Sequence, residues 1–222
     1  MASAERLRSA EGLRERKKRL MRQQLSDTAA RLFLEHGFAA VPVAAVADAC
    51  GVSVKTVFNY FPTKEALLLD RLEETTAALR SAIADPAVPP VDAVLGVLAT
   101  ELDGLTASLG AAGDRAEAVA LHRRFGELIR TTPSLRAHRN DMVDRFVTVA
   151  AAALAVRSGA EPDDPEPLVA GAALVGLWRV QYAALDRHLR DGADLAAVRE
   201  AVTADVRRAA DLVRSGIGSF AR

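Results

Sequence analysis

Apolar residues recur every three to four positions along most of this chain, which is the spacing of amphipathic α-helices. The first such stripe predicts a helix that ends at about His36, and its members are Leu25, Ala29, Leu32 and Phe33. We find no segment that reads as a strand, and no internal repeat. The pattern therefore predicts an all-α protein.

Two short helices joined by a tight turn are predicted next. The first begins at Val43 and ends at Gly51, a residue that reaches positive φ without strain. The second follows Ser53, whose hydroxyl can cap its first turn, and runs from Val54 to Tyr60. It must stop before Pro62, because proline disfavours helical geometry in the preceding residue. This arrangement is a helix-turn-helix, which presents its second helix to the DNA major groove.

The second of these helices separates core residues from candidate DNA contacts. Val57 and Phe61 share one face and are expected to point into the core. The other faces carry side chains suited to phosphates and base edges. The predicted DNA-binding residues of this region are Ser53, Val54, Lys55, Thr56, Asn59, Tyr60 and Lys64. Base edges are assigned to Lys55 and Asn59, and phosphates to the side chains of Thr56, Tyr60 and Lys64.

Charge along the chain is asymmetric, although the formal net charge is zero. Residues 6–22 contain eight basic and two acidic side chains, whereas the segment up to Gly12 has no helical pattern. The basic run 13–19 can be a solvated helix start. It can equally be an arm that follows DNA phosphates or enters the minor groove. Because the run precedes the helix-turn-helix, we favour the arm and include Arg16, Lys17 and Arg22 among the DNA-binding candidates.

Residues 29–68 resemble the DNA-binding domain of TetR-type transcriptional regulators. The resemblance rests on Leu32-Phe33, Gly37-Phe38, Cys50-Gly51-Val52-Ser53, Thr56-Val57-Phe58, Phe61 and Thr63-Lys64-Glu65. Two positions depart from the family pattern. Val41-Pro42 replaces a threonine pair, so a hydroxyl cap and a phosphate contact are missing. Phe58 replaces a tyrosine, which keeps the packing but loses a hydroxyl.

The resemblance implies two domains. Residues 1–64 would form the basic arm and a three-helix DNA-binding domain, and residues 65–222 a helical domain for effector binding and dimerisation. A helix over residues 63–84, capped by Thr63, is expected to link them rigidly. The segment 85–90 then breaks the chain. About nine helices are expected in all, the later ones over residues 91–109, 115–130, 133–158, 168–190 and 194–215.

Small residues on the penultimate helix allow a close helix contact. They include Ala170, Gly171, Ala172 and Gly176. This contact can be core packing, or the two-fold interface of a homodimer built as a four-helix bundle. The family resemblance places the dimer interface on the last two helices, and we favour that interpretation. The predicted interface residues are Ala172, Gly176, Val198 and Val202.

The C-terminal domain also carries a candidate effector pocket. Bulky side chains stand among many alanines on three predicted helices, and pockets are mostly apolar with a few directing polar groups. The candidates are Phe125, Ile129, Met142, Phe146, Trp178, Gln181 and Tyr182. Ordinary core packing is the alternative for each of them. The family resemblance, and not the spacing, is what implies a ligand-responsive domain.

Other chemistries find little support. The four histidines have no spacing for a metal site, and Cys50 lies where a small buried residue is expected, so we predict no metal, cofactor or disulfide. No run reaches the length of a membrane helix, and no signal peptide is seen. The sequence thus predicts a cytoplasmic, non-enzymatic repressor that binds double-stranded operator DNA as a homodimer and responds to a small apolar or amphipathic effector. The alternatives are an effector-independent regulator, an activator, or an enzyme built on the helical domain.

Overall fold

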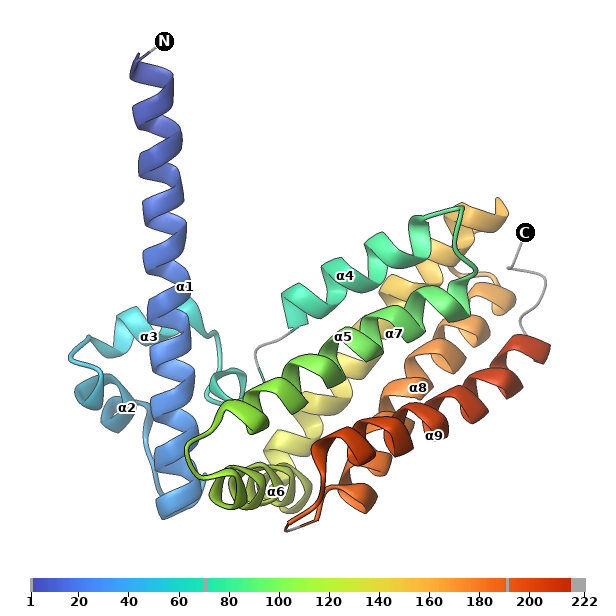
Figure 1. Ribbon diagram of the computed structural model, residues 1–222. Coiled ribbons are helices and arrows are strands. Elements are labelled where there is room, and N and C mark those ends of the chain that lie inside the picture. The colour runs from blue at the N-terminus through green and yellow to red at the C-terminus, as the bar shows by residue number, and fades with distance from the viewer. Residues whose placement is uncertain (1, 70–71, 191, 217–222) are drawn as a thin grey trace. The chain divides into compact units, whose positions relative to one another are not determined.

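The computed structural model describes residues 2–69, 72–190 and 192–216, and for residues 2–15 and 72–73 only the backbone. Within these ranges the chain forms α-helices and one short 3-10 helix, without strands, as the sequence predicts (Figure 1). The α-helices are α1 (Ala2–His36), α2 (Val43–Ala49), α3 (Val54–Tyr60), α4 (Leu72–Ala84), α5 (Pro90–Ala111), α6 (Arg115–Thr131), α7 (Pro133–Ser158), α8 (Pro165–His188) and α9 (Leu195–Gly216). The 3-10 helix is η1 (Glu65–Leu67).

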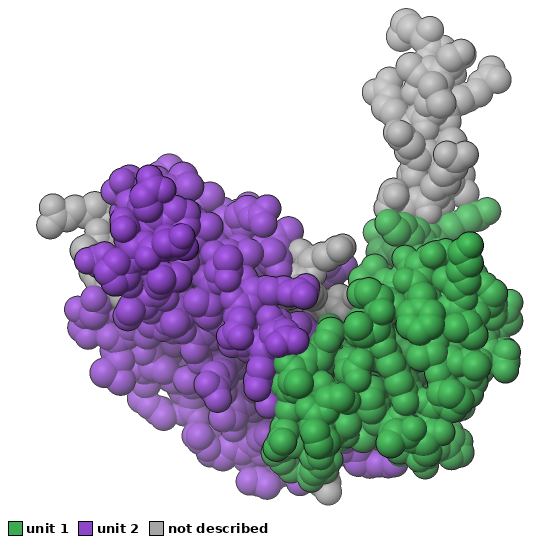
Figure 2. All heavy atoms as spheres, turned by 180° about the vertical axis from the view of Figure 1, so that it is seen from behind, with its two compact units in different colours: residues 1–70, 125–138 green, residues 71–124, 139–222 purple. Residues whose placement is uncertain are grey.

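The chain divides into two compact units, coloured separately in Figure 2. Unit 1 consists of residues 1–70 and 125–138, and unit 2 of residues 71–124 and 139–222. This division differs from the boundary after Lys64 that the sequence suggested. The physical reason is burial, because η1 and the corner between α6 and α7 supply apolar side chains to the core of unit 1.

The core of unit 1 gathers the apolar faces of its helices. The predicted α1 stripe is confirmed, since Leu25, Ala29 and Phe33 are fully buried. The Phe33 and Phe38 rings meet edge to face, with centroids 4.9 Å apart. The other buried members include Val46, Ala47, Val57, Phe61, Leu67, Ile129 and Leu135. This core fixes the orientation of α2 and α3 relative to α1.

Two expectations about helix ends need correction. Residues 63–84 do not form one α-helix: η1 ends at Leu67, Leu68 lies in a turn, and α4 begins at Leu72. Leu67 is buried in the core of unit 1, whereas Leu79 is buried in that of unit 2, so the segment serves two cores. In addition, α1 begins at Ala2, well before the predicted start near residue 13. The early segment is rich in Ala, Leu, Arg and Glu, which are strong helix formers.

Unit 2 is built around α5, α8 and α9, with α4 packed on α5. Helices α5 and α8 are long and apolar enough to cross a membrane by composition, yet they contribute the core of this unit. Close packing of α8 on α7 depends on Gly171, where a Cβ atom would lie 2.9 Å from the Ala151 amide nitrogen. The small-residue face of α8 therefore serves, at this glycine, the packing of a single chain.

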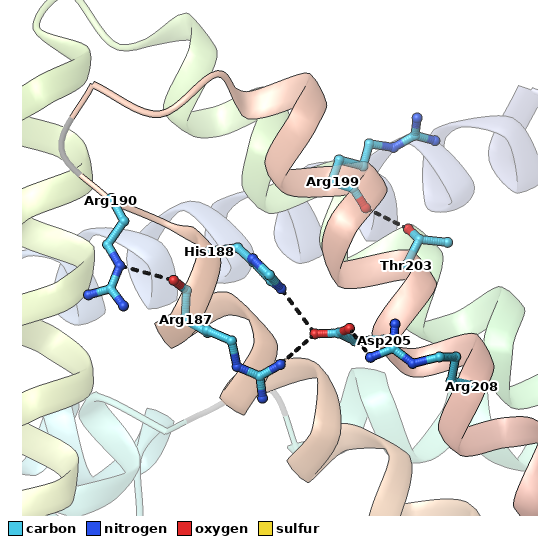
Figure 3. Close-up of polar contacts among 7 residues, drawn as sticks. All are labelled: Arg187, His188, Arg190, Arg199, Thr203, Asp205 and Arg208. Carbon is cyan, nitrogen blue, oxygen red and sulfur yellow. Dashed lines mark hydrogen bonds and ion pairs between the residues drawn. The ribbon is translucent and has the colours of Figure 1, made fainter.

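Polar side chains fix the helix ends of unit 2. The Asp205 carboxylate on α9 accepts from Arg187 at 2.8 Å and lies 3.0 Å from the His188 ring nitrogen, both on α8 (Figure 3). Arg208, one turn along α9, donates to the same carboxylate at 2.6 Å. The Arg157 guanidinium on α7 caps the end of α4 by donating to the carbonyl oxygens of residues 83, 85 and 86.

Candidate DNA-binding site

The turn between α2 and α3 has the geometry that the sequence predicts. Gly51 adopts φ 67°, a left-handed conformation that glycine reaches without strain. The Ser53 hydroxyl oxygen accepts a hydrogen bond from the Thr56 amide at 3.1 Å and lies 2.8 Å from the Thr56 hydroxyl. At the start of α2, Pro42 occupies the cap position without a side-chain hydrogen bond, as its departure from the family pattern implies.

Helix α3 presents two different sides. Val57 and the capping residue Phe61 are buried, which anchors the helix. Lys55 and Asn59, one turn apart, are exposed to solvent. Thr56 and Tyr60 are half-buried at the edge of the exposed side. Lys55 and Asn59 are thus available to base edges, while Thr56 and Tyr60 flank them.

The exposed side of α3 also carries two large apolar residues. Val54 and Phe58 are 39% and 47% exposed. They are four residues apart, so they lie one above the other on the helix. Sequence analysis included Val54 among the DNA contacts but assigned Phe58 to packing alone. Phe58 lies four residues after Val54 and on a different face from buried Val57. This spacing could have identified Phe58 as an exposed residue of α3.

Lys64 has partners inside unit 1. Its ammonium group donates to the Phe38 carbonyl oxygen at 2.5 Å and lies 4.4 Å from the centroid of the Phe38 ring. Burial lowers the pKa of the Lys64 ammonium, and the neighbouring Glu65 carboxylate works in the opposite direction. The residue proposed for phosphate binding therefore also joins the segment after α3 to the loop after α1.

The predicted arm residues lie on α1. Arg16 and Lys17 are exposed, so their charges are available to phosphates. Arg22 is half-buried, with its guanidinium carbon 5.0 Å from the centroid of the Phe61 ring. The remaining basic side chains before residue 16 lie outside the described side chains.

The candidate pocket residues are divided between the two units. Phe125 and Ile129 pack with the core of unit 1, whereas the other five belong to unit 2. In unit 2 the rings of Phe146 and Trp178 lie 6.1 Å apart, and Met142 packs against the same core. Tyr182 is exposed. Gln181 is buried and lines a groove between α5 and α9.

Trp178 has a polar partner in unit 2. Its indole N–H donates to a Glu101 carboxylate oxygen at 2.9 Å, and the Thr75 hydroxyl donates to the other oxygen at 3.2 Å. These bonds join α8, α5 and α4. Trp178 is thus a packed core residue whose nitrogen is satisfied within the chain.

The four predicted interface residues also fall into two groups. Ala172 is exposed and Gly176 half-exposed, and no atom lies within 4 Å of a Cβ added at Gly176. By contrast, Val198 and Val202 are buried in the core of unit 2. The side chains of both residues therefore face the core of their own chain, so we withdraw them from the predicted interface.

Comparisons with known proteins agree with this geometry. Residues 25–70 match the family model described as bacterial regulatory proteins, tetR family, and residues 102–213 match the MftR C-terminal domain. The Mycobacterium tuberculosis protein that carries the name mycofactocin biosynthesis transcriptional regulator MftR is 30% identical over 169 residues, which cover 75% of this chain and 79% of that protein. The HTH-type transcriptional regulator TcmR of Streptomyces glaucescens is 32% identical over 158 residues, covering 69% and 67%.

A solved structure shares the fold. NalD, the secondary repressor of the MexAB-OprM multidrug efflux pump in Pseudomonas aeruginosa, matches with a TM-score of 0.50 and 20% identity over 86% of this chain and 97% of that one. The helix-turn-helix of α2 and α3, the two family matches and the two relatives lead to one conclusion. The chain belongs to the TetR family of bacterial transcriptional regulators.

Proposed function

We propose that this regulator is a cytoplasmic repressor that binds a palindromic operator as a homodimer and is released by a small apolar or amphipathic effector. The observation that carries the proposal is that Lys55 and Asn59 are exposed on α3, while Ser53 caps this helix and Val57 is buried beneath it. A short helix held this firmly can position side chains on base edges with little loss of conformational entropy on binding.

In this proposal, some side chains around α3 contact base edges and others contact phosphates. Asn59 offers both a donor and an acceptor to an adenine edge, and Lys55 donates to guanine. Thr56, Tyr60 and the arm residues on α1 contact phosphates, which fix the register but carry no sequence information. Affinity should therefore fall steeply with salt, whereas base preference should depend on Lys55 and Asn59.

The dimer is proposed because one α3 helix reads only a few base pairs, and a two-fold partner supplies the second half-site. The outward side of α8 supports it. Val169 is two-thirds exposed, and Ala172, Gly176 and Ala183 continue the same side at helical spacing. Arg179 is exposed on this side as well, but the small residues around it leave room for a close self-complementary contact.

Release by an effector requires that the effector bind the DNA-incompetent state more tightly than the DNA-bound state. Helices α6 and α7 contain residues of both units, and α4 follows directly on unit 1 in the chain. These three helices are the proposed route by which a ligand in unit 2 changes operator affinity. Reciprocity then requires operator DNA to weaken effector binding by the same factor.

Selection of binding sites from a random pool of duplex DNA tests the proposal. We expect a palindrome whose half-sites lie about one helical turn apart, because two α3 helices must enter successive major grooves on one DNA face. Sedimentation of the protein with the selected duplex should give two chains per palindrome. Recovery of no enriched sequence, or of a single half-site bound by one chain, would refute the proposed mode of DNA binding.

The sign of regulation needs a separate assay. A reporter gene placed behind the selected palindrome should be silent when the regulator is present and active when it is deleted. Higher expression in the presence of the regulator would identify an activator instead.

A further inference from the structure

An open groove runs along unit 2 between α5 and α9, which lie side by side (Figure 1). Its volume is about 430 Å³, within the range of small-molecule sites. Buried apolar side chains line part of it, namely Leu98 and Leu102 of α5 and Val206 of α9. The charged side chains of Arg207 and Asp211 on α9 line another part. Small residues leave the space open, since Gly96 and Ala99 occupy the α5 wall.

Two exposed ion pairs connect these helices near the groove. Asp92 of α5 bonds Arg214 of α9 at 2.5 Å at one end. Asp103 and Arg199 join the same helices beyond the other end. Both pairs are about half exposed, so solvent screens them, and the packing of α5 against α9 sets the walls of the groove.

The buried wall of the groove contains a polar group with no partner in the chain. Gln181 of α8 is 3% exposed and lines the groove among the apolar side chains. Among the described residues, none hydrogen-bonds its side-chain amide, although the amide has two donors and one acceptor. In the part of the chain that the structure describes, Arg157 Nε is the one fully buried side-chain nitrogen or oxygen without a partner, so the Gln181 amide still meets solvent in the groove. A polar group of a bound molecule can take the place of that solvent.

We propose that this groove binds a small, mostly apolar molecule that carries one hydrogen-bonding group, which meets the Gln181 amide. The inference rests on the proposed function, because it names the site and chemical class of the effector. It names a different site from the one suggested on α6 and α7, because the suggested residues of those two helices do not line the groove. Of the seven residues that the sequence suggested, Gln181 is the one that lines this groove.

Gly96 provides a substitution that fills the groove without disturbing the fold. No atom lies within 4 Å of a Cβ added there, and the glycine is helical with ordinary φ. Gly104 on the same helix is equally open and, like Gly96, exposed, but it does not line the groove. Gly96→Leu and Gly104→Leu therefore form a matched pair, with the same change on the same helix and only one of them inside the site.

The probe is N-phenyl-1-naphthylamine, an uncharged fluorophore with one N–H group, titrated into the full chain without DNA. We expect saturable binding at one site per chain, weakened about tenfold or more by Gly96→Leu through steric exclusion and unchanged by Gly104→Leu. Equal affinity for wild type and Gly96→Leu would overturn the inference. A change of oligomeric state in Gly96→Leu, seen by sedimentation, would also overturn it, because the groove would then be a subunit contact.

Gln181 is tested with a second probe, 1-benzylnaphthalene, in which a methylene replaces the N–H of the first. Gln181→Leu should weaken N-phenyl-1-naphthylamine by about threefold to tenfold, the effect of one neutral hydrogen bond, and should not weaken 1-benzylnaphthalene. Equal weakening of both probes would contradict the role of the amide. Operator binding is measured separately, with and without probe. If wild type does not bind the operator in the absence of probe, the proposed function is refuted. The two probe titrations test ligand binding in the groove independently of that result.

Discussion

The Lys64 ammonium donates to the Phe38 carbonyl oxygen at 2.5 Å, and so joins the end of the helix-turn-helix to the loop that follows α1. The same ammonium lies 5.3 Å from the centroid of the Phe33 ring and closer still to the Phe38 ring. One N–H is thus used inside unit 1, and two others can reach a phosphate. A loss of DNA affinity on mutation of Lys64 would therefore combine two effects, which have to be separated.

Lys64→Met keeps the aliphatic stem but removes the charge. We expect it to lower the free energy of unfolding by about 1 kcal/mol, because the Phe38 carbonyl loses its donor and the two rings lose a cation. Operator affinity should fall by a similar factor for all sequences. Urea denaturation and anisotropy titrations at several salt concentrations measure the two effects.

Lys55→Met is the matched control, because Lys55 is exposed on α3. It should leave stability unchanged and relax base preference. If Lys64→Met proves as stable as wild type, the internal hydrogen bond contributes nothing and the residue acts on DNA alone.

Two substitutions of Ser53 separate its contribution to stability from its contribution to DNA binding. Ser53→Ala removes the oxygen that accepts from the Thr56 amide, and should cost about 1 kcal/mol of stability. Ser53→Asp keeps a capping oxygen, so stability should be retained, but its negative charge should repel phosphate and weaken operator binding. Thermal melts and operator titrations of both variants test this. Tight operator binding by Ser53→Asp would place Ser53 away from the DNA backbone.

Phe58 is expected to contact thymine methyl groups in the operator. It is nearly half exposed beside Val54 on the reading side of α3, and apolar side chains recognise the C5 methyl of thymine. Phe58→Ala should weaken the selected operator by about 1–3 kcal/mol. Replacing individual thymines by uracil, which lacks only the methyl group, should weaken wild type at one position and have little further effect on Phe58→Ala. An operator that tolerates uracil at every position would exclude this contact.

Local signals made the reading module predictable. Gly51, Ser53 and Pro62 each specify the backbone within two or three residues, so the sequence alone predicts the turn, the cap and the end of α3. Such determinants act within one turn of helix and do not depend on the rest of the fold.

The sequence was less informative about which core each buried side chain joins. The sequence assigns Ile129 to a pocket and Val202 to a dimer interface, whereas in the structure each is buried in a core of its own chain. Ile129 belongs to the same core as Leu25, about a hundred residues earlier in the chain, and Val202 is buried in the core of unit 2. Periodicity reports that a helix has an apolar face, whereas the identity of the facing element depends on tertiary contacts.

The dimer prediction compares Gly176 of α8, which has open space around it, with Gly171, which packs closely on α7. Gly176→Arg and Ala172→Arg place a charged side chain where there is space in the single chain, so folding should be preserved. If this side is the desolvated dimer contact, both variants should sediment as monomers and bind the palindrome weakly. Gly171→Ala should behave differently, losing stability because its Cβ would press on the α7 backbone. A fully dimeric Gly176→Arg would move the interface to another surface.

The last prediction concerns acid stability at the α8–α9 contact. The pKa of Asp205 is lowered from 3.8, chiefly by the hydrogen bond from His188, with smaller contributions from Arg208 and Arg187. Burial acts in the opposite direction but does not prevail. A carboxylate whose pKa is lower in the folded state stabilises the fold above its unfolded pKa, and this stabilisation disappears as pH falls through the folded value.

Asp205→Asn should therefore unfold at lower urea concentration than wild type at pH 7, and the difference should shrink below pH 3.8. Urea midpoints followed by circular dichroism between pH 7 and pH 3 measure this. Asp103→Asn, which removes the exposed pair with Arg199 that also joins α9 to a neighbouring helix, should change the midpoint little, because solvent screens that pair. A constant difference between Asp205→Asn and wild type across the whole range would mean that packing, and not the charge on Asp205, holds the end of α8 against α9.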